Sequence, residues 1–281
     1  MRFGAHVSAA GGVWNAPEHA ASIGCEVLQM FSRPPQGGTP APITAETIQK
    51  FQTSMKEHGI HAAYIHAPYF INLASGEARI RHGSIQIIRD ELERGSLLHC
   101  RSLMFHPGSG KDLGQEKGMQ AVVEGLDEIL DGYKGTCQLL IEISAGAGMI
   151  LGDSFEEIAY FLNKTKYGKK IGVCFDTQHA VASGYDIRTK EAWEKTIEHF
   201  DILIGLERLV LSHCNDSKTP FESHKDRHEH LGKGSIGLSA FKILVQHPKL
   251  QHIDLILETP FEPDISGIKK DLQQLKKFRN V

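Results

Sequence analysis

Apolar, β-branched runs alternate along this chain with stretches that have helical spacing. Eight runs have the length of a buried strand, and they cover residues 2–7, 26–31, 60–66, 101–106, 138–143, 171–176, 209–214 and 253–258. Between them, apolar residues recur at helical intervals, as at Ile48, Phe51 and Met55. Alternating strands and helices predict parallel pairing through right-handed crossovers, and eight repeats predict an α/β fold that closes as a (β/α)₈ TIM barrel.

Helix start signals mark several of the predicted connections. Thr44, Ser154 and Thr189 each have the side chain of an N-cap and stand directly before a predicted helix. Residues 265–278 carry apolar side chains on one face, among lysines, and predict a closing helix. No linker of low-complexity composition interrupts the series, so we expect residues 1–281 to form one domain.

Six of the eight runs carry a side chain that can bind a metal ion at or next to their last position. Three are histidines and three are carboxylates: His66, His106, His213, Glu142, Asp176 and Glu258. In a (β/α)₈ barrel the active site lies at the carboxyl ends of the strands, so these side chains should meet at one mouth. Burying several carboxylates together is costly unless cations pair with them, which predicts a multi-metal site.

Two local patterns add to this set of ligands. His179 follows Asp176 by one turn of chain, and Asp226 and His228 lie two residues apart, so an extended segment would point them the same way. Taken alone, residues 224–230 would fit a solvated, highly charged loop better than a metal site. Five imidazoles and four carboxylates suit Zn²⁺, tolerate Mn²⁺ or Fe²⁺, and match Mg²⁺ and Ca²⁺ poorly.

The number of candidate ligands sets the number of ions. At about three protein ligands per catalytic ion, nine groups suffice for about three ions. Four carboxylates do not neutralise that many dications, so the centre would keep a net positive charge and attract a phosphodiester.

Composition bears on the binding partners and the cellular compartment of the protein. The chain has 31 Lys and Arg against 34 Asp and Glu, which gives a net charge of −3. This overall charge gives no signature of nucleic-acid binding, but it does not exclude a local basic face. The five cysteines are odd in number and far apart, which indicates reduced thiols. With no apolar signal core or membrane span in the sequence, we expect a cytoplasmic protein.

Several sequence blocks resemble one known family, the endonuclease IV class of apurinic/apyrimidinic (AP) endonucleases, nearly from end to end. The blocks are GAHVSAAGG (4–12), INL (71–73), FHPGS (105–109), CFDTQHA (174–180), GYD (184–186), NDSK (215–218), DRH (226–228), LGKG (231–234) and ILET (256–259). The resemblance implies a zinc-dependent DNA repair enzyme that works in base excision repair. Its substrate would be duplex DNA, which it would cut 5′ to an abasic site, leaving a 3′-hydroxyl and a 5′-deoxyribose phosphate.

The resemblance also assigns the metal ligands. One zinc would be held by His66, His106 and Glu142; a second by Glu142, Asp176, His213 and Glu258; a third by His179, Asp226 and His228. A zinc-bound hydroxide between the first two ions would attack phosphorus, since zinc lowers the pKa of bound water to about 7. Glu142 and Glu258 are the expected catalytic carboxylates, and the protein is expected to act as a monomer.

Loops after the strands are the expected DNA contacts. Tyr69 and Phe70, after the third strand, match the family pattern of side chains that enter the base stack, although they could simply cover the barrel rim. The Pro- and Gly-rich loop 32–42 departs from that pattern and offers only Arg33 and Gln36 as long polar groups.

Further polar contacts with DNA are expected from residues in later loops: Asn72, Lys218 and Arg227, with Lys111, Lys225 and Lys233 as additional phosphate contacts. His6 ends the first strand and should face the mouth. It could support a metal ligand from behind, contact a phosphate, or be a purely structural histidine.

The residues alone leave two other functions to consider. A metal-dependent sugar isomerase or epimerase could use a similar barrel, but it would need fewer ions and a base for proton transfer. A metal-stabilised DNA- or protein-binding barrel without activity would have no need for an open hydrolytic centre. Five candidate imidazoles, the pair Asp226 and His228 and the family blocks favour the nuclease over the isomerase, and the complete set of nine ligands argues against an inactive barrel.

Overall fold

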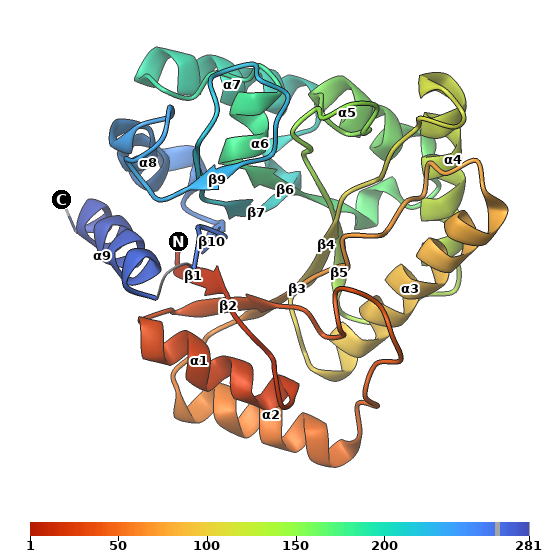
Figure 1. Ribbon diagram of the computed structural model, residues 1–281, viewed down its shortest axis with the longest axis horizontal. Coiled ribbons are helices and arrows are strands. Elements are labelled where there is room, and N and C mark those ends of the chain that lie inside the picture. Colours follow the sequence, from red (N-terminus) through yellow and green to blue (C-terminus); the bar gives the residue numbers. More distant parts are fainter. Residues whose placement is uncertain (262–264, 281) are drawn as a thin grey trace.

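The computed structural model describes residues 1–261 and 265–280, and there eight parallel strands close into a barrel. The strands are β1 (Phe3–His6), β2 (Val27–Met30), β3 (Ala63–His66), β4 (Ser102–Phe105), β5 (Gln138–Glu142), β6 (Gly172–Asp176), β7 (Leu209–His213) and β10 (Asp254–Leu257). They follow one another around the barrel in chain order, and β1 pairs with β10 to close it (Figure 1). The predicted TIM barrel is confirmed.

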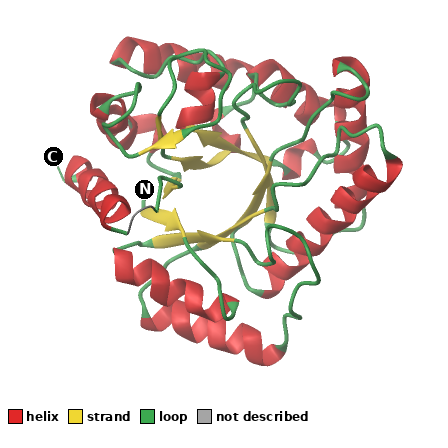
Figure 2. Ribbon diagram, in the orientation of Figure 1, coloured by secondary structure: helices red, strands yellow, loops and turns green. Residues whose placement is uncertain are grey.

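Helices surround the strands on all sides (Figure 2). They are α1 (Ala16–Ile23), α2 (Ala45–Glu57), α3 (Ala78–Leu97), α4 (Gln115–Leu130), α5 (Phe155–Lys164), α6 (Thr177–Ala182), α7 (Lys190–Leu203), α8 (Leu238–Gln246) and α9 (Ser266–Arg279). The N-caps predicted at Thr44, Ser154 and Thr189 are confirmed, because each side chain accepts a backbone N–H hydrogen bond in the first turn. No helix in the described ranges combines the length and apolar character that crossing a membrane requires.

The hydrophobic core has two layers. The larger lies between strands and helices, and the smaller fills the barrel interior with one buried side chain from each of seven strands: Val27, Tyr64, Met104, Leu140, Cys174, Leu211 and Ile256. Because side chains alternate along a strand, the residue two positions after each of these also points inward. Those positions hold Gln29, His66, His106, Glu142, Asp176, His213 and Glu258. The alternation therefore places a polar layer directly above the apolar interior.

A long segment between β7 and α8 covers one side of the mouth. It contains a two-stranded antiparallel sheet of β8 (Asp216–Ser217) and β9 (His228–Glu229). The buried carboxylate of Asp216 accepts hydrogen bonds from the backbone N–H groups of Gly232 at 2.8 Å and Ile236 at 2.9 Å. These bonds fold the segment back on itself and hold β9 over the strand ends.

A buried carboxylate links several strands at the opposite end of the barrel. Asp254, 2% exposed, accepts hydrogen bonds from the guanidinium of Arg2 at 2.7 Å and the hydroxyl of Tyr64 at 2.8 Å. A buried carboxylate is tolerated only when such partners satisfy it. The network ties β1, β3 and β10 together at the end away from the mouth.

We predict that Tyr64→Phe lowers the free energy of unfolding by about 1 kcal/mol, because one buried hydrogen bond is lost while Arg2 still pairs with Asp254. Urea unfolding measures this change. Tyr160→Phe, on a half-buried side chain of α5, is the matched control and should change stability by less than about 0.5 kcal/mol. A Tyr64→Phe protein as stable as the wild type would contradict this role for the network.

Candidate metal centre

The first group of predicted ligands comes from three neighbouring strands. His66 ends β3, His106 directly follows β4, and Glu142 ends β5. The Nε2 atoms of His66 and His106 lie 3.3 and 3.5 Å from the same carboxylate oxygen, Oε2 of Glu142. The other ring nitrogen of His66 lies 2.6 Å from the carbonyl oxygen of Ala67, and that of His106 lies 3.3 Å from the hydroxyl of Ser144. Both imidazoles are therefore anchored with Nε2 facing Glu142.

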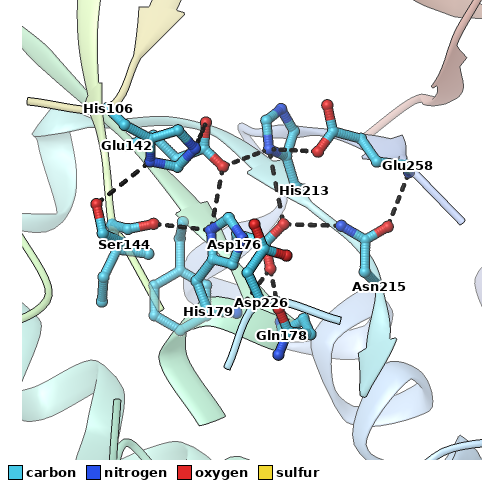
Figure 3. Close-up of polar contacts among 12 residues, drawn as sticks. His106, Glu142, Ser144, Asp176, Gln178, His179, His213, Asn215, Asp226 and Glu258 are labelled. Atoms are coloured by element: carbon cyan, nitrogen blue, oxygen red, sulfur yellow. Dashed lines mark hydrogen bonds and ion pairs between the residues drawn. The ribbon is translucent and has the colours of Figure 1, made fainter. Parts of the chain in front are cut away.

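The second group shares Glu142 with the first (Figure 3). His213, at the end of β7, places Nδ1 2.8 Å from Oε1 of Glu142 and 3.3 Å from Oε2 of Glu258. Asp176, at the end of β6, brings Oδ2 to 3.7 Å from the same nitrogen. Glu142 thus faces the first group with one oxygen and the second with the other, as a bridging carboxylate must.

The third group lies nearest the solvent. The Nε2 atoms of His179 and His228 lie 3.4 Å apart, and each is 3.4 Å from Oδ1 of Asp226. His179 reaches the mouth from the first turn of α6, whereas Asp226 and His228 come from the segment folded over it. The structure therefore brings together all nine residues that the sequence singled out as metal ligands.

Neighbouring charges in the centre shift one another's pKa values. Burial opposes the charge on Glu142, yet imidazoles, His106 first among them, hold its pKa well below the usual range. Burial also opposes the charge on His179, but Asp176 and Asp226 raise its pKa well above the ordinary value. Burial opposes the charge on Asp226 too, but the hydrogen bond from His179 and the charges of His179 and His228 together outweigh it and lower the pKa to about 2. The carboxylates keep their charge only through a concentration of positive charge beside them.

The donor set fits divalent metal ions. Oε2 of Glu142 is buried and has no hydrogen-bond partner within residues 1–261 and 265–280, although two imidazole nitrogens face it. Likewise, the ring nitrogens of His179 and His228 face each other across a short gap beside a carboxylate. An ion held between such groups would satisfy both arrangements, and the mixture of nitrogen and oxygen donors suits zinc-like ions.

Residues outside the predicted set orient the ligands. Oδ1 of Asp176 caps α6 by accepting from the backbone N–H of His179 at 2.9 Å, which leaves Oδ2 for the centre. The amide of Asn215 donates to that Oδ2 at 2.7 Å and accepts from the backbone N–H of Glu258 at 2.8 Å (Figure 3). Sequence reasoning missed this role of Asn215, and its position two residues after His213 was the available signal.

Gln29 and His6 complete the polar layer on β2 and β1. Gln29 is fully buried and lies within hydrogen-bonding distance of His213, Glu258 and His6. His6 packs against Phe31 with ring centroids 4.4 Å apart, and it lines the mouth as expected. Gln29 was missed because a glutamine is a poor metal ligand, although it interrupts an apolar run at the inward position that ligands occupy on other strands.

The centre opens into a cavity of about 690 Å³. Deep in it lie imidazoles and carboxylates of the centre, and its outer wall includes the exposed aromatic residues Tyr69, Phe70 and Phe261. Tyr69 is 73% exposed and packs on Phe31 at a centroid distance of 5.2 Å and on His66 at 5.7 Å. A mouth of this size, polar at the bottom and apolar at the rim, can admit a small-molecule group or an extruded nucleotide.

Arg33, which the sequence suggested as a DNA contact, forms ion pairs within the protein, and a contact with DNA stays a prediction. Its side chain is 7% exposed and turns away from the mouth, where Nε donates to the buried Glu91 of α3 at 2.7 Å and Nη2 donates to Asp90. Ser32 and Arg94 also bind Glu91. Arg33 therefore fastens the Pro- and Gly-rich loop to α3, because a buried carboxylate requires this positive charge.

The other predicted DNA contacts differ in exposure and in the hydrogen bonds that they form within the protein. Gln36, Lys218 and Arg227 are exposed, and Arg227 donates through its guanidinium to the carbonyl of Asp226 at 2.5 Å. Asn72 is half-buried, and its Oδ1 accepts from the backbone N–H groups of Ala74 at 3.0 Å and Ser109 at 3.1 Å. Asn72 thus joins the loops after β3 and β4, and a contact of these residues with DNA stays a prediction.

Fold and site together define a class of protein: a TIM barrel with a cluster of metal-binding side chains at the mouth. The family model for the xylose isomerase-like TIM barrel matches residues 17–278. The crystal structure of a D-tagatose 3-epimerase-like protein covers 100% of this chain and 97% of its own, with 18% identity and a TM-score of 0.73, and so shares the fold.

Closer similarity narrows the class to one family. A Chloroflexus aggregans protein called probable endonuclease 4 is 38% identical over 281 residues, which span 100% of this chain and 98% of that protein. The crystal structure of endonuclease IV from Thermus thermophilus has 33% identity and a TM-score of 0.86, covering 100% of this chain and 98% of its own. The chain belongs to the endonuclease IV family.

We predict that Arg33→Met lowers the free energy of unfolding by roughly 1–3 kcal/mol, because it removes a charged donor from the buried Glu91. The metal content should not change. Thermal or urea unfolding with elemental analysis measures both quantities, and Arg79→Met on the exposed start of α3 is the matched control. Unchanged stability together with a loss of metal would show that Arg33 serves the mouth instead.

Proposed function

We propose that this protein is a zinc-dependent AP endonuclease that repairs duplex DNA. It hydrolyses the phosphodiester 5′ to an abasic site and leaves 3′-hydroxyl and 5′-deoxyribose phosphate ends. The convergence of five imidazoles and four carboxylates at one barrel mouth carries the proposal, because this set has the donors for about three ions. The names of the Chloroflexus and Thermus relatives support the endonuclease activity.

The three groups of side chains would each hold one ion. His66, His106 and Glu142 would hold the first, while Glu142 would bridge to a second completed by the carboxylates and His213; His179, Asp226 and His228 would hold the third. When bound, zinc supplies a nucleophile at neutral pH by lowering the pKa of water to about 7, and it stabilises charge on phosphate oxygens. Mn²⁺ or Fe²⁺ could substitute, since the same donors accept them.

The protein's own residues would hold the phosphodiester in line for this chemistry. Glu142 is fixed by imidazoles on both of its oxygens, so it can keep an attacking group oriented without moving. Glu258 also lines the cavity and lies 3.3 Å from His213. It can therefore help to hold the same phosphodiester group that Glu142 faces. We assign the catalytic roles to these two carboxylates, and no side chain has to protonate the leaving oxygen.

Recognition of the lesion would depend on the rim. An abasic nucleotide has lost the stacking and pairing that hold a base in the helix, so turning it into the cavity costs less than for an intact nucleotide. Tyr69 and Phe70 project from the rim and could fill the space left in the stack. Lys218 and Arg227 would contact phosphates, which makes binding weaken steeply with salt. Because Arg33 is bound to α3, Gln36 is the long polar side chain of loop 32–42 that would contact DNA.

One chain supplies every residue of this proposed site, so we propose a monomer formed by one barrel domain. The five cysteines are buried and unpaired, which suits the reducing cytoplasm in which we place the protein.

A sugar isomerase or epimerase is the rival function, because such enzymes share the barrel. The pair His179 and His228 with Asp226 argues against it, since this third group adds to a centre that already has donors for two ions. An inactive DNA-binding barrel would not need the arrangement at Glu142, whose buried oxygen is left for an ion.

We predict that the zinc-loaded protein incises a synthetic duplex with one abasic site, on the 5′ side of the lesion, and spares the intact duplex. Denaturing electrophoresis with end-group analysis measures the cut and identifies both ends. Glu142→Gln should lose most of the incision, by at least about 100-fold as expected when transition-state stabilisation is removed, yet keep most of its affinity for the damaged duplex. Its matched control is Glu46→Gln, an exposed carboxylate on α2, which should cut as the wild type does.

The rival functions give different outcomes in the same assay. Turnover of a ketose or aldose without cleavage would establish the isomerase. Tight binding of damaged duplex without cleavage by zinc-loaded wild-type protein would establish the inactive barrel.

A further inference from the structure

Gln29 is a buried polar residue in contact with two proposed metal ligands. It lies on β2 with 0% of its surface exposed, in the apolar run Val27-Leu28-Gln29-Met30. Its Oε1 is 2.8 Å from Nε2 of His213, and its Nε2 is 2.6 Å from Oε1 of Glu258. The same Nε2 is 2.9 Å from Nδ1 of His6. One amide thus bonds to both of these ligands and to the histidine beside them.

The carboxylate of Glu258 fixes which way this amide faces. A carboxylate accepts hydrogen bonds, so the amide NH₂ of Gln29 must face Glu258 and the amide oxygen must face His213. The opposite orientation would bring two acceptor oxygens together at 2.6 Å in a buried place. The neighbours of Gln29 therefore determine its orientation, and no assumption about its flip is needed.

This orientation determines the tautomer of His213. Because the amide oxygen only accepts, Nε2 of His213 must carry a proton and donate it. Nδ1 is then the nitrogen available to an ion, and it is the one that faces Glu142, Glu258 and Asp176. A metal-bound histidine commonly has its second nitrogen held in this way, which sets the ring orientation and raises its basicity.

The second hydrogen of the same NH₂ determines the tautomer of His6. Nδ1 of His6 accepts from Gln29 at 2.9 Å, whereas its distance of 3.6 Å to Glu258 is too long for a hydrogen bond. The proton of His6 is therefore on Nε2, on a ring that lines the cavity.

We propose that Gln29 is a positioning residue of the metal centre: it sets the tautomers of His213 and His6 and holds Glu258 in its binding orientation. The proposal rests on the metal centre of the proposed function and does not depend on the DNA substrate. Within residues 1–261 and 265–280, the proposed ligands that bond to Gln29 are His213 and Glu258 of the second group. Its loss should therefore weaken the ion between Glu142, Asp176, His213 and Glu258 and leave the other two unaffected.

The test measures the release of zinc from the loaded protein to a series of chelators of increasing strength. For Gln29→Leu and Gln29→Met we expect one ion to be released roughly 10–100-fold more readily and the other ions as in the wild type. The control is Gln138→Leu at the far end of β5, where the amide donates to the carbonyl of Lys170 at 3.4 Å. A role limited to packing would lower the melting temperature of the Gln29 variants without a selective loss of one ion.

A second measurement needs no variant and so stands if the substitutions fail to fold. In nitrogen-15 spectra of zinc-loaded wild-type protein, we expect His213 to carry its proton on Nε2 with Nδ1 bound to metal, and His6 to carry its proton on Nε2. A His213 bound to metal through Nε2 would overturn the proposal.

The outcomes separate this proposal from the metal centre on which it rests. If the wild-type protein binds zinc and the Gln29 variants release every ion as readily as the wild type, the role of Gln29 is overturned and the metal centre stands. Wild-type protein that binds no zinc would overturn the metal centre and this role with it.

Discussion

Glu142 is a carboxylate with no exposed surface, surrounded by imidazoles at the mouth of the barrel. His66 and His106 face one of its oxygens, and His213 and His179 face the other. A buried charge of this kind is stable only among compensating charges, and the imidazoles compensate it at the cost of crowding protons together. Divalent ions would resolve that conflict, because they would provide the positive charge and let each imidazole act as a neutral ligand.

The barrel supplies this arrangement through the simple alternation of side chains on a strand. An apolar residue fills the interior of the barrel, and the residue two positions later points into the mouth above it. On β5 these are Leu140 and Glu142, and on β7 they are Leu211 and His213. The apolar layer keeps water out from below, so the ligands meet in surroundings where electrostatic interactions are strong. Closure of the barrel through β1 and β10 brings Glu258 back to the first strands.

The parts of the site that were predictable from the sequence are those encoded locally. A strand period, a position near the strand end and a side chain of a metal-binding type lie within a few residues of one another, and so the candidate ligands on the strands could be predicted. The ion pairs of Arg33 could not be predicted, because Asp90 and Glu91 lie nearly sixty residues later and only the packing of α3 reveals them. Gln29 shares the inward register of the ligands, but its importance depends on His213 and Glu258, which approach it only when the barrel closes.

The central claim is that nine side chains of this mouth hold three ions, and anomalous X-ray diffraction at the zinc absorption edge tests it most directly. Crystals of protein purified without chelator should show three strong peaks. One should lie between His66 and His106, one beside His213, and one between His179 and His228. A single peak, or peaks away from these side chains, would contradict the account.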